Sequence, residues 1–284
     1  MARSSWSRRN FRKHNKYAKY TATAIPVAQG TTIGGRTISQ ILEQEGYAGL
    51  YGTEVKYQNK TFRVFYVEDS SNKFGEGEGT IYLKADQITT TALGPNSSTV
   101  NAYNSSKTVI RTVNPEWAIA RGSVAESSWQ VNEKAAAYLC DPTVETWSTY
   151  IDQTDENVNW VIGAPSAEMY MRSYAQSHSS SAANYAAKYF AQGANSNAYT
   201  NGYLYTIDGA NYNSNYSGAI ANDNAMYRNS SQYWWLASPS ANYATYVCYV
   251  VGGSGHVSRD DVDYAGGACP LVSLKSGVTL ELAD

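Results

Sequence analysis

Side chains suited to making contacts gather in residues 240–264, near the end of the chain. Tyrosine offers a large amphipathic contact area at low entropic cost, and Ser, Gly and Asn provide adaptable hydrogen bonds. We therefore expect a ligand-binding face here, with packing between subunits or an ordinary polar surface as the alternatives. The predicted ligand-binding residues are Asn242, Tyr243, Tyr246, Tyr249, His256, Ser258, Arg259, Asp260, Asp261, Asp263 and Tyr264.

Catalytic chemistry finds little support among the residues. The three histidines, His14, His178 and His256, lie in unrelated sequence contexts. A Ser, His and Asp set can be picked from any chain this rich in Ser and Asp, so such a set carries no weight without geometry. We expect no enzyme activity and no cofactor.

Cysteine and acidic residues do not have the spacing of a metal site. Cys140, Cys248 and Cys269 are an odd number with no C-x-x-C pair, which argues against a zinc ribbon or a disulfide framework. They are expected to be small buried hydrophobic residues, and whether Cys248 and Cys269 pair stays open. The densest acidic cluster lies at residues 260–263, where we expect a solvated edge and no metal.

Charge divides the chain into a basic arm and an acidic body. The 284 residues include 22 basic and 24 acidic side chains, for a net charge of −2. Seven basic and no acidic residues lie in residues 1–20, so this arm carries +7 and the rest of the chain −9. Aromatic residues are interleaved with the basic ones, a mixture that suits docking on a protein neighbour or stacking on nucleic acid. A frayed terminus is the third alternative. The predicted assembly arm comprises Arg3, Arg8, Arg9, Arg12, Lys13, Lys16 and Lys19.

The first part of the chain predicts an arm over residues 1–22 and a small β-rich anchoring domain over residues 23–107. Apolar spacing and turn residues indicate its elements. They are a helix near residues 38–45, strands at 55–57, 62–67 and 80–85, and a turn at 58–60.

Residues 108–284 predict a domain that mixes helices with short strands. A long Ser-, Ala-, Asn- and Tyr-rich segment at residues 177–232 is expected to form loops that decorate this scaffold. The expected helices lie at 132–140, 143–151 and 166–176. The expected strands lie at 157–162, 243–251, 256–264, 269–274 and 278–282, with a hairpin turn at 252–255 and an apolar, aromatic run at 232–238.

Two motifs carry a resemblance. One reads Y-W-W-L-A-S-P at residues 233–239 and continues as G-A-C-P-L-V-S-L at 267–274, and the other reads N-W-V-I-G-A-P-S-A-E-M at 159–169. They resemble the W-W-L-R-S-P, G-V-R-P-L-V-x-L and A-I-G-G-P-T-x-E-M segments of C-type-lectin-like domains of the formylglycine-generating-enzyme type. Such domains occur in bacterial and prophage surface proteins and in the variable proteins of diversity-generating retroelements.

The resemblance implies an α+β fold over residues 108–284: a small twisted antiparallel sheet, two helices and long loops on one side. Trp234 and Trp235 lie in the apolar signature, so we expect them to anchor the core rather than touch a ligand. The family pattern has an arginine where this chain has Ala237 and Cys269, so no arginine-based ligand site is expected at these two positions.

Together these features predict a non-enzymatic phage virion surface protein that displays a lectin-like domain for ligand or host recognition. The chain has no run of 18 apolar residues and its arm lacks a signal-peptide pattern, so we expect synthesis in the host cytoplasm, no membrane insertion, and an extracellular place after release. Expected partners are other virion proteins, further copies of the chain, and a host-surface protein or glycan. The alternatives are a structural capsid or tube subunit that assembles through the lectin-like fold and the arm, and a nucleic-acid-binding arm.

Overall fold

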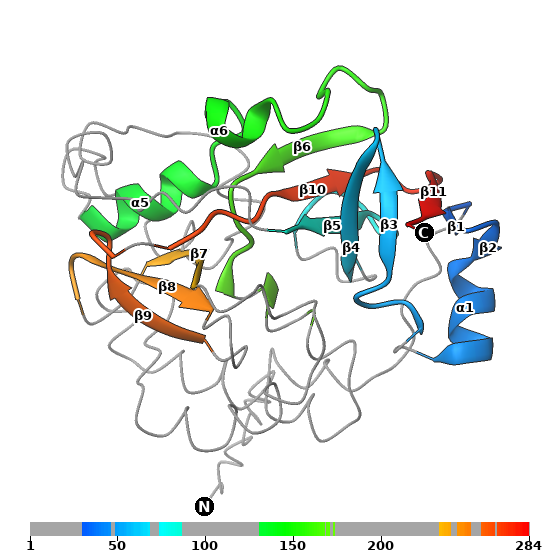
Figure 1. The fold of residues 1–284 in the computed structure, drawn as a ribbon, viewed down its shortest axis with the longest axis horizontal. Helices are drawn as coiled ribbons and strands as arrows, with labels where there is room; N and C mark the ends of the chain where they lie inside the picture. Colours follow the sequence, from blue (N-terminus) through cyan, green and yellow to red (C-terminus); the bar gives the residue numbers. More distant parts are fainter. Residues whose placement is uncertain are drawn as a thin grey trace, which may run out of the picture.

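The computed structural model describes residues 30–46, 49–68, 74–86, 131–167, 169–170, 173, 233–239, 243–250, 257–264 and 266–283. Over these ranges the fold is mixed α+β, with mostly strands, few helices and two open sheets (Figure 1). This confirms the α+β class. The predicted arm, the loop at 177–232 and the hairpin turn at 252–255 lie outside the described residues.

An eight-stranded sheet forms the larger layer, with the order β2-β1-β11-β3-β4-β5-β10-β6. Only the pair of β1 and β11 is parallel, so strands from the two ends of the described chain lie side by side. The strands are β1 (Thr32–Ile33), β2 (Arg36–Thr37), β3 (Glu54–Tyr57), β4 (Lys60–Val67), β5 (Ile81–Ala85), β6 (Val158–Ile162), β10 (Leu271–Leu274) and β11 (Thr279–Leu282).

The hairpin of β3 and β4 follows directly from its sequence. Gln58 and Asn59 both have positive φ, 48° and 60°, the backbone that a two-residue type I′ turn needs. Such a turn matches the right-handed twist of its flanking strands, so it fixes the register in which Tyr57 faces Lys60. The predicted turn and strands are confirmed, with Lys60 as the first residue of β4.

The predicted boundary at residue 107 cuts through this sheet. β5 comes from the front part of the chain, yet its other neighbour is β10, and β11 lies between β1 and β3. The physical reason is that a three-stranded meander of β3, β4 and β5 would leave both of its edges unpaired. Strands from the end of the chain cover these edges, so the described strands of residues 23–107 share one sheet with β10 and β11.

Three helices lie wholly within the described residues: α1 (Ile38–Glu45), α5 (Val131–Leu139) and α6 (Glu145–Ser148). Thr37 caps α1 in a capping box with Gln40, and the chain leaves the helix at Gly46 with φ 66°. α1 and α5 confirm the predicted helices near 38–45 and at 132–140. Residues 167, 169, 170 and 173 are helical and Ser166 precedes them, while residues 168, 171–172 and 174–176 of the helix predicted at 166–176 lie outside the described part.

The helix predicted over residues 143–151 is wrong in its extent, because only α6 forms there. The Asp141 carboxylate accepts hydrogen bonds from the backbone N–H and the hydroxyl of Thr143, at 2.8 and 2.7 Å. The backbone carbonyl of Asp141 accepts a third from Trp147 Nε1, at 2.7 Å. These local bonds compete with a helical start at Pro142. The first helical turn is therefore delayed to Glu145.

A second sheet holds β7 (Trp234–Pro239), β8 (Tyr246–Val250) and β9 (Val257–Asp261) in antiparallel order, beside α5 in Figure 1. β8 and β9 confirm the strands predicted at 243–251 and 256–264, and β7 lies in the apolar, aromatic run at 232–238. Backbone bonds attach β7 to the rest of the chain: Trp235 N–H donates to the Gly267 carbonyl at 2.9 Å, and Ala237 N–H to the Pro165 carbonyl at 2.8 Å. The small sheet is thus fixed to the segments that lead into β10 and follow β6.

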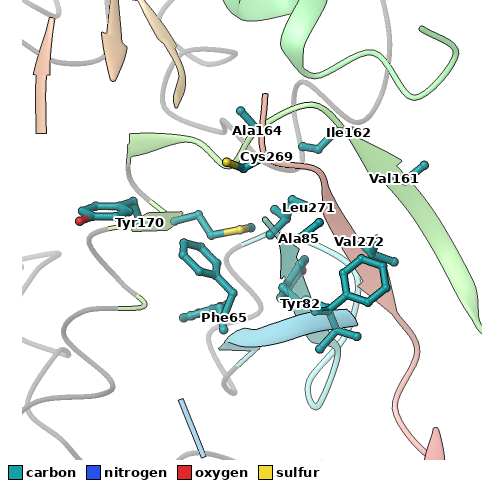
Figure 2. Close-up of a cluster of buried hydrophobic side chains, with 14 of the residues drawn as sticks. Phe65, Tyr82, Ala85, Val161, Ile162, Ala164, Tyr170, Cys269, Leu271 and Val272 are labelled. Atoms are coloured by element: carbon teal, nitrogen blue, oxygen red, sulfur yellow. The ribbon is translucent and has the colours of Figure 1, made fainter. Parts of the chain in front are cut away.

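The hydrophobic core joins both sheets. Figure 2 shows the part of it in which Phe65, Tyr170, Leu271 and Cys269 approach one another from different elements. Trp234 and Trp235 are both buried, which confirms their predicted place as core anchors. All three cysteines are buried thiols, as expected, so Cys248 and Cys269 do not pair.

Candidate recognition face

Cross-strand register assigns the predicted binding residues of β8 and β9 to two faces. Tyr246 lies opposite Asp261 and Cys248 opposite Arg259, which places these four on one face. Tyr249 lies opposite Ser258 on the other face. Residues 247–250 are buried and only Tyr246 is half-buried, so neither face of β8 is open along its length. Exposure concentrates at the end of the hairpin that carries Tyr243 and Tyr264.

The first aromatic cluster is a stack at the start of β8. The rings of Tyr243 and Tyr246 are nearly parallel, with centroids 4.6 Å apart and 26° between their planes. Arg259 reaches over the Tyr243 ring, with Cζ 5.0 Å from its centroid. Tyr243 keeps 47 % of its surface exposed. The stack therefore presents an ordered aromatic side chain, with a guanidinium against it, to a partner.

The second aromatic cluster lies on the opposite face. The centroid of the Tyr233 ring is 4.9 Å from that of Tyr249 and 5.2 Å from that of Tyr264, both edge-to-face, while Tyr249 and Tyr264 stack at 6.3 Å. Tyr264 is 39 % exposed and Tyr249 only 8 %. Burial, and then the hydrogen bond with Tyr233, raise the pKa of Tyr264. The exposed ring thus rests on two others.

Tyr233 is a site residue that the sequence did not predict. It directly precedes Trp234 and Trp235, so its pattern is that of a buried apolar run. In the structure Tyr233 is half-buried and directly precedes β7, and its carbonyl accepts a hydrogen bond from Gly267 N–H at 2.8 Å. An aromatic residue just before a strand is a weak sequence signal of a surface site. Only the register between β7 and β8 could have placed Tyr233 beside Tyr249.

The carboxylates of Asp260 and Asp261 hold the end of β9 in place. Asp260 Oδ1 accepts from the backbone N–H of Asp261 at 2.8 Å, and Asp261 Oδ2 accepts from the Thr245 hydroxyl at 2.8 Å. The ion pairs between described residues do not include these carboxylates. No group of metal-ligating side chains is found in the described residues. The cluster therefore contributes negative charge and acceptor atoms next to the exposed tyrosines.

The outer edge of β9 is closed at Asp261. Val262 N–H donates inward to the Thr245 carbonyl at 2.9 Å, so the backbone groups of Asp261 point the other way. Its N–H is taken by Asp260, and its carbonyl accepts from Tyr264 N–H at 2.9 Å. An added strand would find no backbone donor or acceptor at this residue. Side chains are therefore the groups that Asp261 and its neighbours leave available at this end.

Several predicted residues are not tested. Asn242, His256 and the arm residues lie outside the described chain, and Ser258 is placed only by its backbone opposite Tyr249. The structure brings together Tyr243 and Tyr246 with Arg259 and Asp261, and Tyr249 with Tyr264. Asp260 lies opposite Val247, and the backbone N–H of Asp263 donates to Asp261 Oδ1 at 3.4 Å.

Ionisable groups away from this face serve the fold. Glu68 is buried and accepts from the Tyr82 hydroxyl at 3.1 Å and from Phe74 N–H at 3.2 Å. Burial raises the pKa of Tyr82 well above its usual value. On β8 itself, Cys248 is fully buried, and this burial raises the pKa of its thiol to about 12, which leaves it protonated and a poor nucleophile near neutral pH.

A buried lysine joins the two sheets. Lys84 Nζ, on β5, lies 4.9 Å from the ring centroid of Trp234 on β7 and donates to the Ala85 carbonyl at 3.3 Å. Both residues are fully buried. A cation over an indole face is attracted by the ring quadrupole. The contact therefore fixes the small sheet against the large one.

The structure is that of a mixed α+β protein with two partly exposed tyrosine clusters at one end of the β8–β9 hairpin. No protein-family model, curated protein or solved structure matches the chain. The helices among the described residues are all too short or too polar to cross a membrane.

Proposed function

We propose that this chain is a non-enzymatic binding protein of a phage virion surface, in which a C-type-lectin-like framework displays the β8–β9 hairpin for host or ligand recognition. The observation that carries the proposal is the pair of exposed rings, Tyr243 and Tyr264, each held by stacking partners. Aromatic side chains that are ordered before binding lose little entropy on binding, so they are effective contact residues.

The framework part of the proposal draws on the motifs. Residues of the first motif, at 233–239 and 267–274, are buried, as framework residues should be. They include Trp234, Leu236, Leu271 and Val272. The mixed helix-and-strand architecture agrees with a lectin-like domain. The sheet of that framework takes strands from both sides of residue 107, so the full chain is the unit to test.

Binding of the full chain to intact bacterial cells and to an array of bacterial and host glycans and glycoproteins tests this function. We expect wild type to bind at least one probe, and Tyr243→Ala and Tyr264→Ala each to weaken that binding about tenfold or more. Leu282→Ala is the matched control, because Leu282 is an exposed apolar residue (43 %) on β11. No binding by folded wild type, or equal binding by all variants, would reject the proposal.

The alternative is a structural subunit that assembles through its arm. Its support is electrostatic: the +7 arm complements an acidic body, whose β9 end carries three carboxylates outside the described ion pairs. Deletion of residues 1–20 should then abolish assembly at low salt, measured by light scattering. Particles that form unchanged after the deletion would exclude this function, and steep salt dependence of DNA binding would instead indicate a nucleic-acid-binding arm.

A further inference from the structure

The start of helix α5 lies against the loop that carries the exposed Tyr243. The first N–H groups of a helix have no partner within the helix, so they need acceptors from elsewhere. Here the backbone N–H of Asn132 donates to the Ala244 carbonyl at 3.0 Å. The loop before β8 therefore caps α5, and the helix in turn holds the loop.

The side chain of Asn132 adds a second bond to the same loop. Its Nδ2 donates to the carbonyl of Tyr243 at 2.8 Å, and the residue is fully buried. A buried amide can hold a backbone carbonyl firmly, because water does not compete for the bond. Asn132 thus donates hydrogen bonds to the carbonyls of two consecutive loop residues, Tyr243 and Ala244.

Among the described residues, few other contacts restrain Tyr243. It precedes β8, so no ladder bond of that strand holds it, and the turn bond from Tyr246 N–H to its carbonyl is long, at 3.3 Å. Its ring is 47 % exposed and touches only one side of the sheet through Tyr246 and Arg259. The bond from Asn132 is the shortest hydrogen bond to its backbone among those of the described residues.

We propose that Asn132 is a positioning residue of the recognition face: it fixes the backbone of Tyr243 so that the ring stacks on Tyr246 and presents its open side to the ligand. This inference rests on the proposed function for its consequence, which is binding, but the position of Tyr243 can be measured without any ligand. The far end of α5 is tied to the large sheet, since Gly163 N–H donates to the Leu139 carbonyl at 2.8 Å. The helix therefore connects the pose of Tyr243 to the core.

Fluorine NMR of the full chain labelled with 3-fluorotyrosine tests this position. The loss of one resonance in Tyr243→Phe assigns the signal of Tyr243. In Asn132→Asp, an isosteric change that removes the donor and sets a carboxylate against the carbonyl, we expect this signal to move to the position of a solvent-exposed fluorotyrosine. Asn132→Ala should do the same, and it serves if the buried carboxylate prevents folding.

Asn159→Asp is the matched control. Asn159 Nδ2 donates to Ser273 Oγ at 3.0 Å in the large sheet, so the same substitution removes an equivalent bond far from the loop. It should leave the Tyr243 signal unchanged. A Tyr243 signal that stays in place in folded Asn132 variants overturns the positioning role, and so does an equal movement in the control.

Binding to the cell and glycan probes separates this inference from the proposed function. We expect the Asn132 variants to bind about tenfold more weakly than wild type, the loss given by one well-formed hydrogen bond. If wild type binds neither probe while the Tyr243 signal still moves, the recognition function fails and the positioning role stands. If wild type binds, the signal moves and affinity stays the same, the pose of Tyr243 does not serve recognition and the inference fails.

Discussion

The two sheets differ in what their side chains do. In the eight-stranded sheet, every residue of β5 and β10 is buried, and the strands pair on both sides. In the three-stranded sheet, β9 is an edge strand with Arg259, Asp260 and Asp261 in a row, and the tyrosines around it stay partly exposed. Packing determines the side chains of the first sheet. At the β9 edge of the second sheet, packing buries the tyrosine and charged side chains only in part, and the proposed contact surface draws on these side chains.

The largest effect is expected from a cavity in the large sheet. Leu83 is fully buried on β5 between Val64 of β4 and Val272 of β10. Leu83→Ala should lower the free energy of unfolding by about 3 kcal/mol, because it removes apolar contacts and leaves a void. Urea denaturation followed by circular dichroism measures this. Tyr264→Ala, on the small sheet, should cost less than about 1 kcal/mol, and equal losses would break the contrast between the sheets.

A matched pair of glycines sharpens the comparison. A Cβ at Gly163 would lie 2.8 Å from the Trp147 ring, and a Cβ at Gly266 would lie 2.6 Å from the Trp235 ring. Both substitutions to Ala should therefore cost about 1–3 kcal/mol through overpacking. Only Gly266→Ala should also change the near-ultraviolet circular dichroism of the cluster around Tyr249, whose ring centroid is 6.1 Å from that of Trp235. Identical spectral changes in both variants would show that the clusters are not separate.

The sequence predicts local features of both sheets and fails where distant segments meet. The turn at Gln58 and Asn59 and the capped helix at Thr37 depend on neighbouring residues, so their patterns are sufficient. The pairing of β5 with β10 joins segments far apart in sequence, and no pattern within either strand specifies that partner. The delayed start of α6 depends on the side chain of Asp141, which favours a turn that helix patterns do not reveal.

The same limit applies to the recognition face. Composition identified the hairpin, because tyrosine, arginine and aspartate are conspicuous there. Composition could not give Tyr233 or Asn132, since each acts through one contact with another segment: the ring of Tyr249 and the carbonyl of Tyr243. Such contacts depend on how β7 and α5 pack against β8.

A smaller effect is expected where the large sheet is tied to its neighbouring loop. The Asp155 carboxylate accepts from the Tyr57 hydroxyl at 2.6 Å, from Gln58 Nε2 at 3.1 Å and from Asn157 N–H at 2.9 Å. These bonds, with Tyr57 first, lower the pKa of Asp155 to about 2. Asp155→Asn should cost about 1 kcal/mol at pH 7, the value of one net hydrogen bond.

The pH dependence of this loss has a definite sign. A carboxyl whose pKa is lower in the folded state stabilises the fold above its unfolded pKa, about 3.9, and loses that contribution as the pH falls through its folded pKa. The difference between wild type and Asp155→Asn should therefore be constant above pH 5 and shrink between about pH 4 and pH 2. Urea denaturation at several pH values measures it, with Glu281→Gln on β11 as the exposed control. A difference that grows on acidification would contradict the assignment.

The smallest expected effect concerns a single proton on the recognition face. The pKa of Tyr264 is raised by burial and then by its hydrogen bond with the Tyr233 hydroxyl. Tyr233→Phe keeps the ring beside Tyr249 but removes that bond, so the pKa of Tyr264 should fall part of the way to that of a free tyrosine. Absorbance at the wavelength of tyrosinate, with Tyr264→Phe to identify the signal, follows this titration. The pKa of Tyr264 is higher in the folded state than in the unfolded state. Its contribution to stability is therefore complete below the pKa of an ordinary tyrosine and is lost as the pH rises through the folded pKa. An unchanged titration in Tyr233→Phe would mean that the hydroxyls of Tyr233 and Tyr264 are not coupled. Stacking alone would then hold the exposed ring of Tyr264, in contrast to the phenol of Tyr57 in the large sheet, which donates a hydrogen bond to Asp155.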